Sequence, residues 1–136
     1  MGSATSYFEN LCLDAILGDN KGASMPATVY VALFTTTPDD GGGGTEVSST
    51  GTGYARVAVT NNSTNWPTAT GGIKSNGTTV TFPTATDSWG NIQWVAIYDA
   101  ATAGNMLLWG ETSSTITPVT GNTPYFSPGG FAITCD

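Results

Sequence analysis

The sequence predicts an all-β protein: a jelly-roll-like antiparallel β-sandwich with one short N-terminal α-helix. Three observations support this fold class. Short runs alternate apolar and polar residues with the period of a strand. Glycine, proline and asparagine clusters separate about eight such runs, a pattern typical of sandwiches and jelly rolls. Charged residues make up 10% of the chain, well below the roughly 25% of ordinary soluble domains, whereas glycine and threonine are abundant.

The chain is long enough for one domain with a single core. We divide it into an N-terminal helix and linker arm, residues 1–26, and a β-sandwich domain, residues 27–136. In the arm, residues 6–17 are the helix candidate. Ser6 and Glu9 have the spacing of a capping box, and Gly18 suits a left-handed C-terminal cap.

One apolar face follows the helical period, formed by Phe8, Leu11, Cys12, Ala15 and Ile16. Such a face indicates burial of one side of the helix. Two interpretations remain open. The helix packs on its own domain, or it is an arm that docks on a neighbouring subunit.

The first strand is expected at residues 27–36, where alternation is clear. A proline, two aspartates and four glycines follow and cannot continue a strand, so residues 38–44 form a loop. A short strand is expected at 45–48 and a longer one at 54–60.

The dipeptide Asn76-Gly77 predicts a two-residue hairpin, because a type I′ turn needs positive φ at both positions. It would join strands at 73–75 and 78–82.

In residues 92–98, both sets of alternating positions are largely apolar. Because these two sets face opposite sides of a strand, the segment is predicted to be a strand buried on two faces. Further strands are expected at 105–110, at 112–119 as an edge, and at 131–134. Residues 121–130 are expected to form a loop, because they contain two prolines and a glycine pair.

The net charge of −7 argues against binding to nucleic acid, because the chain has only three basic residues to neutralise phosphates. An anionic membrane surface would repel it for the same reason, and no apolar run approaches the length of a membrane span. The N-terminus lacks the basic region of a secretion signal.

Cys12 and Cys135 could bridge the two ends of the chain, although such cysteines are more often free.

Catalytic chemistry has little support in this sequence. The chain has no histidine, which excludes Ser-His-Asp and Cys-His arrangements. We therefore expect no enzyme, no cofactor and no metal site. The acidic residues near the glycine run, Asp39, Asp40 and Glu46, would permit a calcium site, but turn formation is their default role. Arg56, the sole arginine, is expected to be a structural ion-pair or hydrogen-bond partner, and the alternative is a residue that clamps a ligand.

Six aromatic or apolar residues are candidates for an interface with another protein. Trp66 and Trp89 fall in predicted loops, unlike Trp94 and Trp109, which fall in strands and are expected in the core. Phe8 and Leu11 belong to the helix, and the remaining candidates, Tyr125 and Phe126, follow Pro124 in the loop at 121–130.

Several motifs resemble a family of small virion proteins of tailed bacteriophages. They are the GGGTEV segment at 42–47, GYAR at 53–56, WG at 89–90 and IYDA at 97–100, with GN at 104–105 and LWG at 108–110. Members are often labelled tail-fibre-like, and the family is similar to capsid-decorating (cement) proteins with a jelly-roll-type fold. The resemblance extends from about residue 29 to the end and implies a non-enzymatic, oligomeric structural subunit.

Two functional hypotheses follow from this resemblance. The first is a capsid decoration protein on the outer surface of the phage head, where a dimer or trimer binds the major capsid protein and stabilises contacts between capsomers. An acidic chain suits that surface better than the DNA-filled interior. The alternative is a tail or tail-fibre component, either a connector or a host-surface binding module.

Overall fold

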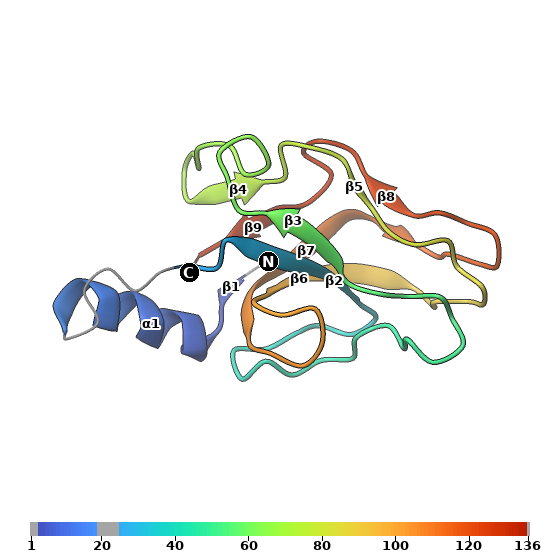
Figure 1. The fold of residues 1–136 in the computed structure, drawn as a ribbon, viewed down its shortest axis with the longest axis horizontal. Helices are drawn as coiled ribbons and strands as arrows, with labels where there is room; N and C mark the ends of the chain where they lie inside the picture. The colour runs from blue at the N-terminus through green and yellow to red at the C-terminus, as the bar shows by residue number, and fades with distance from the viewer. Residues whose placement is uncertain (1–2, 19–24, 136) are drawn as a thin grey trace.

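The computed structural model describes residues 3–18 and 25–135, and it confirms an antiparallel all-β architecture with one short helix (Figure 1). The N-terminal segment contains β1 (Ser3–Ala4) and α1 (Ser6–Leu17). The strands that follow are β2 (Thr28–Phe34), β3 (Val57–Thr60), β4 (Ile73–Ser75), β5 (Val80–Thr81), β6 (Ile92–Tyr98), β7 (Met106–Ile116), β8 (Tyr125–Phe126) and β9 (Ala132–Thr134). No helix in the described residues is long and apolar enough to cross a membrane.

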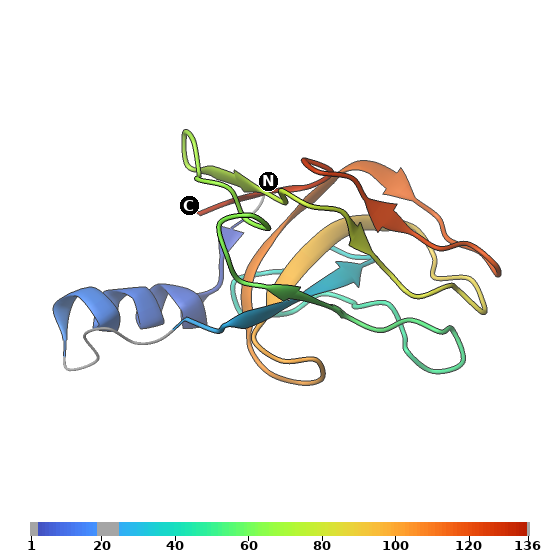
Figure 2. The same ribbon diagram turned by 45° about the horizontal axis from the view of Figure 1, so that its top comes forward.

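Five strands form the main sheet in the order β1-β7-β6-β2-β3, and every pair is antiparallel. Two small sheets, β4-β9 and β5-β8, lie over one face of it and complete a sandwich (Figure 1 and Figure 2). This arrangement does not specifically establish a jelly roll. Because β1 pairs with β7, the first described residues belong to the sheet, and the helix begins directly at its edge.

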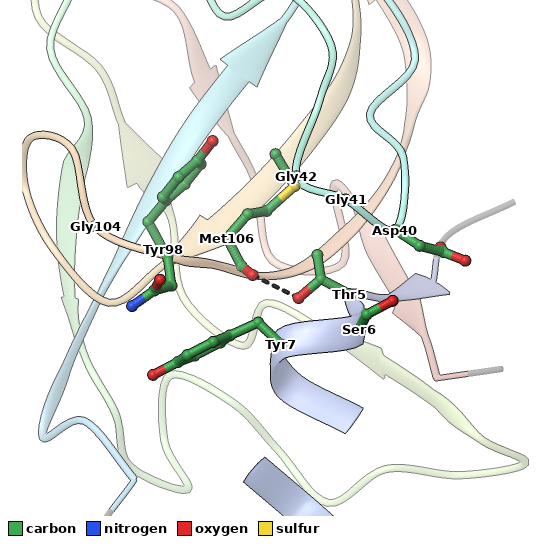
Figure 3. A pocket seen from close by; sticks show the side chains of 10 residues that line it. Thr5, Ser6, Tyr7, Asp40, Gly41, Gly42, Tyr98, Gly104 and Met106 are labelled. Carbon is green, nitrogen blue, oxygen red and sulfur yellow. Dashed lines mark hydrogen bonds between the residues drawn. The ribbon is translucent and has the colours of Figure 1, made fainter. Parts of the chain in front are cut away.

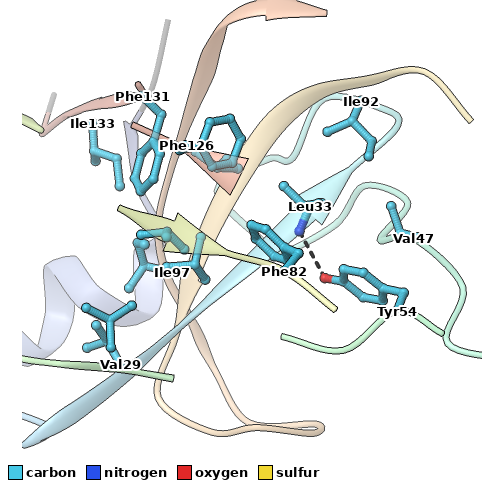
Figure 4. Packing of buried hydrophobic residues seen from close by; sticks show 14 of the residues in the cluster. Val29, Leu33, Val47, Tyr54, Phe82, Ile92, Ile97, Phe126, Phe131 and Ile133 are labelled. Atoms are coloured by element: carbon cyan, nitrogen blue, oxygen red, sulfur yellow. Dashed lines mark hydrogen bonds between the residues drawn. The ribbon is translucent and has the colours of Figure 1, made fainter. Parts of the chain in front are cut away.

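The core lies between the main sheet and the two small sheets (Figure 4). Alternate residues of β2, namely Val29, Val31 and Leu33, point into it, while Ala32 and Phe34 face the opposite side of the sheet. On that side Phe34 stacks on Tyr98 with ring centroids 6.5 Å apart. The apolar residues on both faces of β6 therefore reflect two packed surfaces, as the sequence predicts.

The predicted hairpin at Asn76-Gly77 is wrong. Strand β4 pairs with β9 and β5 pairs with β8, so the two segments flanking this dipeptide do not pair with each other. Asn76 is buried, and its amide group donates hydrogen bonds to the carbonyl oxygens of Thr78 and Ser127 and accepts one from the Phe131 backbone N–H. The side chain thus links three chain segments instead of forming a turn.

Other differences concern short strands. The expected strand at 45–48 is a single bridge between Glu46 and Phe34. Residues 105–110 and 112–119 were expected as separate strands, but most of them form the single long strand β7. Strands β1 and β8 were not expected, since each is two residues long and too short for alternation to identify.

Candidate interaction surfaces

The helix α1 is fixed to the sheet through Thr5, which lies between β1 and the helix (Figure 3). Its side chain is 1% exposed, and its hydroxyl donates to the carbonyl oxygen of Met106 at 2.6 Å. The same oxygen accepts from the Phe8 backbone N–H at 3.4 Å, as expected of an N-cap. The predicted capping box of Ser6 and Glu9 is wrong, because Thr5 is the N-cap and the Ser6 backbone N–H donates to the Asp40 carbonyl oxygen instead of to Glu9.

The glycine-rich loop at 38–44 contacts this attachment point. Its Asp40 carbonyl accepts from the Ser6 backbone N–H at 3.0 Å. Asp39 shapes the loop, since its carboxylate accepts from the backbone N–H groups of Gly41 and Gly43, both at 2.9 Å. A cavity of about 300 Å³ lies between the loop, the start of α1 and Tyr98 (Figure 3). No cluster of three or more metal-ligating side chains is found within residues 3–18 and 25–135.

Arg56 occupies a structural network on the same side of the main sheet. Its guanidinium forms a bidentate pair with the Glu46 carboxylate, at 2.9 Å from Nε to Oε1 and 2.8 Å from Nη2 to Oε2. It also donates to the carbonyl oxygens of Ala100 and Ala103 and lies 3.5 Å above the centroid of the Tyr98 ring. The residue therefore has the structural role predicted for it, and it connects two loops to the sheet.

Burial changes the protonation equilibria of this network. Burial and the neighbouring Glu46 carboxylate raise the pKa of Tyr54, whose hydroxyl donates to that carboxylate at 2.8 Å and accepts from the Leu33 backbone N–H (Figure 4). Burial lowers the pKa of Arg56, but the hydrogen bonds and charge of Glu46 outweigh this effect and raise it overall. Burial and hydrogen bonding thus favour the neutral phenol of Tyr54, and the contacts with Glu46 favour the charged guanidinium of Arg56.

The first candidate interaction surface is the exposed side of α1. No residue of this helix is buried, and the helix extends away from both layers of the sandwich (Figure 1 and Figure 2). Leu13, Ile16 and Leu17 are 57%, 71% and 80% exposed. Glu9 and Asp14 are exposed on the same helix. We call Leu13, Ile16 and Leu17 the arm patch.

The end of α1 also differs from the expectation. Gly18 has φ −147° and ψ −160°, which is extended backbone rather than a left-handed cap.

Cys12 is half-buried and Cys135 is exposed, and both are free thiols. Burial, together with the charge of the Cys135 thiolate, raises the pKa of Cys12.

The second candidate surface is an apolar groove of about 170 Å³ beside the start of α1. Phe8, Leu108 and Lys74 are among the residues that line it. Trp66 also lines the groove, and its buried indole N–H has no hydrogen-bond partner among residues 3–18 and 25–135. The remaining residues are Met25, Pro26, Val29, Asn61, Ile97, Leu107 and Ile133.

The structure separates the six predicted interface residues into two groups. Trp66, Trp89 and Phe126 belong to the core, where Trp89 donates from its indole to the Thr52 carbonyl at 2.8 Å. Their rings pack edge-to-face against other aromatic rings, so the loops carry them inward rather than to the surface. Tyr125 is 62% exposed, and Phe8 and Leu11 are half-buried on α1.

Sequence reasoning missed Leu13, Leu17 and the groove. Apolar residues occur on every side of α1, and this would have indicated that no single face can bury them all. The groove had no such signal, because its walls come from segments far apart in the sequence. Trp94 and Trp109, expected in the core, are half-buried on the other face of the sheet, with ring centroids 5.8 Å apart.

Comparison with protein families identifies a match that covers residues 3–134. The matching family is described as podophage GP4 fiber I protein gp80. No curated protein matches the chain. The family match covers α1 as well as the sandwich, so the helix is part of the shared pattern.

Proposed function

The chain belongs to the podophage GP4 fiber I protein gp80 family, and from this premise we propose that it is a structural subunit of a virion fibre. Membership of this family supports a phage structural protein without enzymatic activity. The family description favours the tail or tail-fibre hypothesis over capsid decoration. The proposal is that the sandwich forms the body of the subunit and α1 attaches it to the rest of the assembly.

The observation that carries this proposal is the exposure of α1. A helix of 12 residues is marginally stable in water by itself, and most helices are stabilised by burying an apolar face. Here the arm patch is exposed although the start of the helix is fixed to the sheet by Thr5. Exposed contiguous apolar surface on a folded protein is typical of an interface. A subunit that is complete only in an assembly fits these features.

Capsid decoration remains the second candidate. The net charge of −7 supports a position outside the DNA-filled head, and the major capsid protein would then be the partner. A fibre also lies outside the head, so the charge favours either location equally.

Antibody-gold labelling of intact virions tests the proposal. Label on fibres at the tail would support it. Label distributed over the head surface would overturn it and support decoration instead. An antibody against residues 121–130 suits this experiment, because this segment is mostly exposed, contains the short strand β8 and lies apart from α1 (Figure 1).

A further inference from the structure

We propose that the arm patch of one subunit docks into the apolar groove of a second copy of this chain. This inference rests on the proposed function and names the partner of α1. Each subunit would supply one arm and one groove, so that contacts run from copy to copy. Such head-to-tail contacts build rings or filaments, depending on whether the rotation closes.

The chain cannot satisfy both surfaces by itself in the observed geometry. Phe8, in the first turns of α1, already lines the groove, while the arm patch lies in the last turns and is exposed. The helix extends away from the sandwich (Figure 1 and Figure 2), and none of Leu13, Ile16 and Leu17 lines the groove of their own chain. A neighbouring copy is therefore the source of the groove that the patch would enter.

Charge supports a second copy over an unrelated partner. Lys74 is exposed at the groove and forms no ion pair with another described residue, whereas Arg56 is engaged by Glu46. The arm is acidic, with Glu9 and Asp14, and has no basic residue in its last turn. The C-terminal end of a helix carries a partial negative charge, which attracts a cation. The arm and the groove are thus complementary in charge as well as in apolar character.

Zero-length cross-linking of isotopically mixed protein tests the docking directly. Unlabelled and ¹⁵N-labelled full-length chains are mixed, treated with a carbodiimide and analysed by mass spectrometry. Docking predicts a Lys74 amide with Glu9 or Asp14, in peptides that contain one light and one heavy partner. If both peptides of every such link are light or both are heavy, the arm contacts the groove of its own chain and the proposal is wrong. If no such link forms, the proposal is also wrong.

Sedimentation velocity of charge variants provides an independent measurement. The wild-type chain is expected to self-associate at micromolar concentration. Replacing Leu13, Ile16 and Leu17 by serine should weaken association by about a thousandfold or more, because three apolar side chains lose their burial. Lys74→Glu should weaken it roughly tenfold, and the double change Glu9→Lys with Asp14→Lys should restore it in the Lys74→Glu background.

Val119→Ser is the matched control, because Val119 is 50% exposed and lies outside both surfaces. It should associate like the wild type. A wild-type chain that stays monomeric would overturn the proposal, as would a serine-substituted arm that still associates. Fibre labelling on virions would be unaffected by either result, so this failure is distinguishable from failure of the proposed function.

Discussion

The network around Arg56 yields a quantitative stability prediction. Arg56 is 9% exposed at its side chain and Glu46 is 25% exposed, so both charges are largely withdrawn from water. Replacing Arg56 by methionine leaves the Glu46 carboxylate with the Tyr54 hydroxyl as its remaining donor, and it removes the donors to two loop carbonyls. Breaking such a buried pair costs about 3–5 kcal/mol, because the other charge stays uncompensated.

A double-mutant cycle isolates the interaction. Glu46→Gln removes the charge but keeps a side-chain oxygen that can accept from Arg56, so we expect a smaller cost of about 1.5–3 kcal/mol. The double variant buries neither charge and should therefore be about 1–3 kcal/mol more stable than the sum of the single changes predicts. Asp40→Asn, at an exposed carboxylate, controls for the loss of one negative charge and should change stability by less than about 0.5 kcal/mol.

Urea unfolding followed by tryptophan fluorescence measures these differences, because Trp89 and Trp66 lie in the core. The slope of the free energy against urea should stay constant across the variants, so that midpoint shifts report stability. An Arg56→Met variant that loses less than about 1 kcal/mol of unfolding free energy would refute the reasoning. Such a result would mean that the Glu46 carboxylate is well solvated without its arginine partner. Strict additivity of the two single changes would refute it as well.

Three further predictions concern other parts of the fold. Thr5→Val should lower the free energy of unfolding in urea by about 1–3 kcal/mol, because it removes the N-cap and a buried hydroxyl. A cost below about 0.5 kcal/mol would contradict the role of Thr5 as the N-cap that fixes α1 to the sheet. Trp94→Ala should lower the free energy of unfolding by about 1.5–3 kcal/mol. This is less than the loss of a fully buried ring would cost, because Trp94 is half-buried against Trp109. A cost near zero would mean that the two rings are not packed. The pKa of Tyr54 is raised above its unfolded value of about 10, so its contribution to stability is complete below that pH and decreases as the pH rises further. Unfolding measured from pH 8 to 11 should show this decrease, with a shallower dependence in Tyr54→Phe, and an identical dependence in the two proteins would contradict the assignment.

The elements that the sequence predicted well are those governed by local periodicity. The helix at Ser6–Leu17 and the strand at Ile92–Tyr98 have the predicted bounds, since a 12-residue helix and a seven-residue strand contain enough residues for a pattern to repeat. The structural role of Arg56 was also predictable, because a single arginine in an acidic, charge-poor chain has few alternatives to an ion pair.

The remaining features depend on contacts between distant segments. Asn76 does not form a hairpin because Ser127 and Phe131, more than 50 residues away, supply its hydrogen-bond partners. Trp66 and Trp89 lie in loops, but they pack in the core against the rings of Phe131 and Phe82, which come from other segments of the chain. The apolar face predicted for α1 is only partly covered: Phe8 and Leu11 are half-buried, whereas Ile16 of the same face is 71% exposed. The direction in which the helix points, and the groove beside it, depend on contacts between distant segments. None of these contacts leaves a local pattern in the sequence.

The most direct test of the role of α1 is the incorporation of an arm variant into virions. Phage carrying serine at Leu13, Ile16 and Leu17 would be purified, and the chain quantified by immunoblot against the Val119→Ser control. We expect the arm variant to fold, by circular dichroism and thermal unfolding, and yet to be absent or strongly depleted in virions that contain the control at wild-type level. Equal amounts of both variants in purified virions would contradict the proposal that this helix attaches the subunit to the assembly.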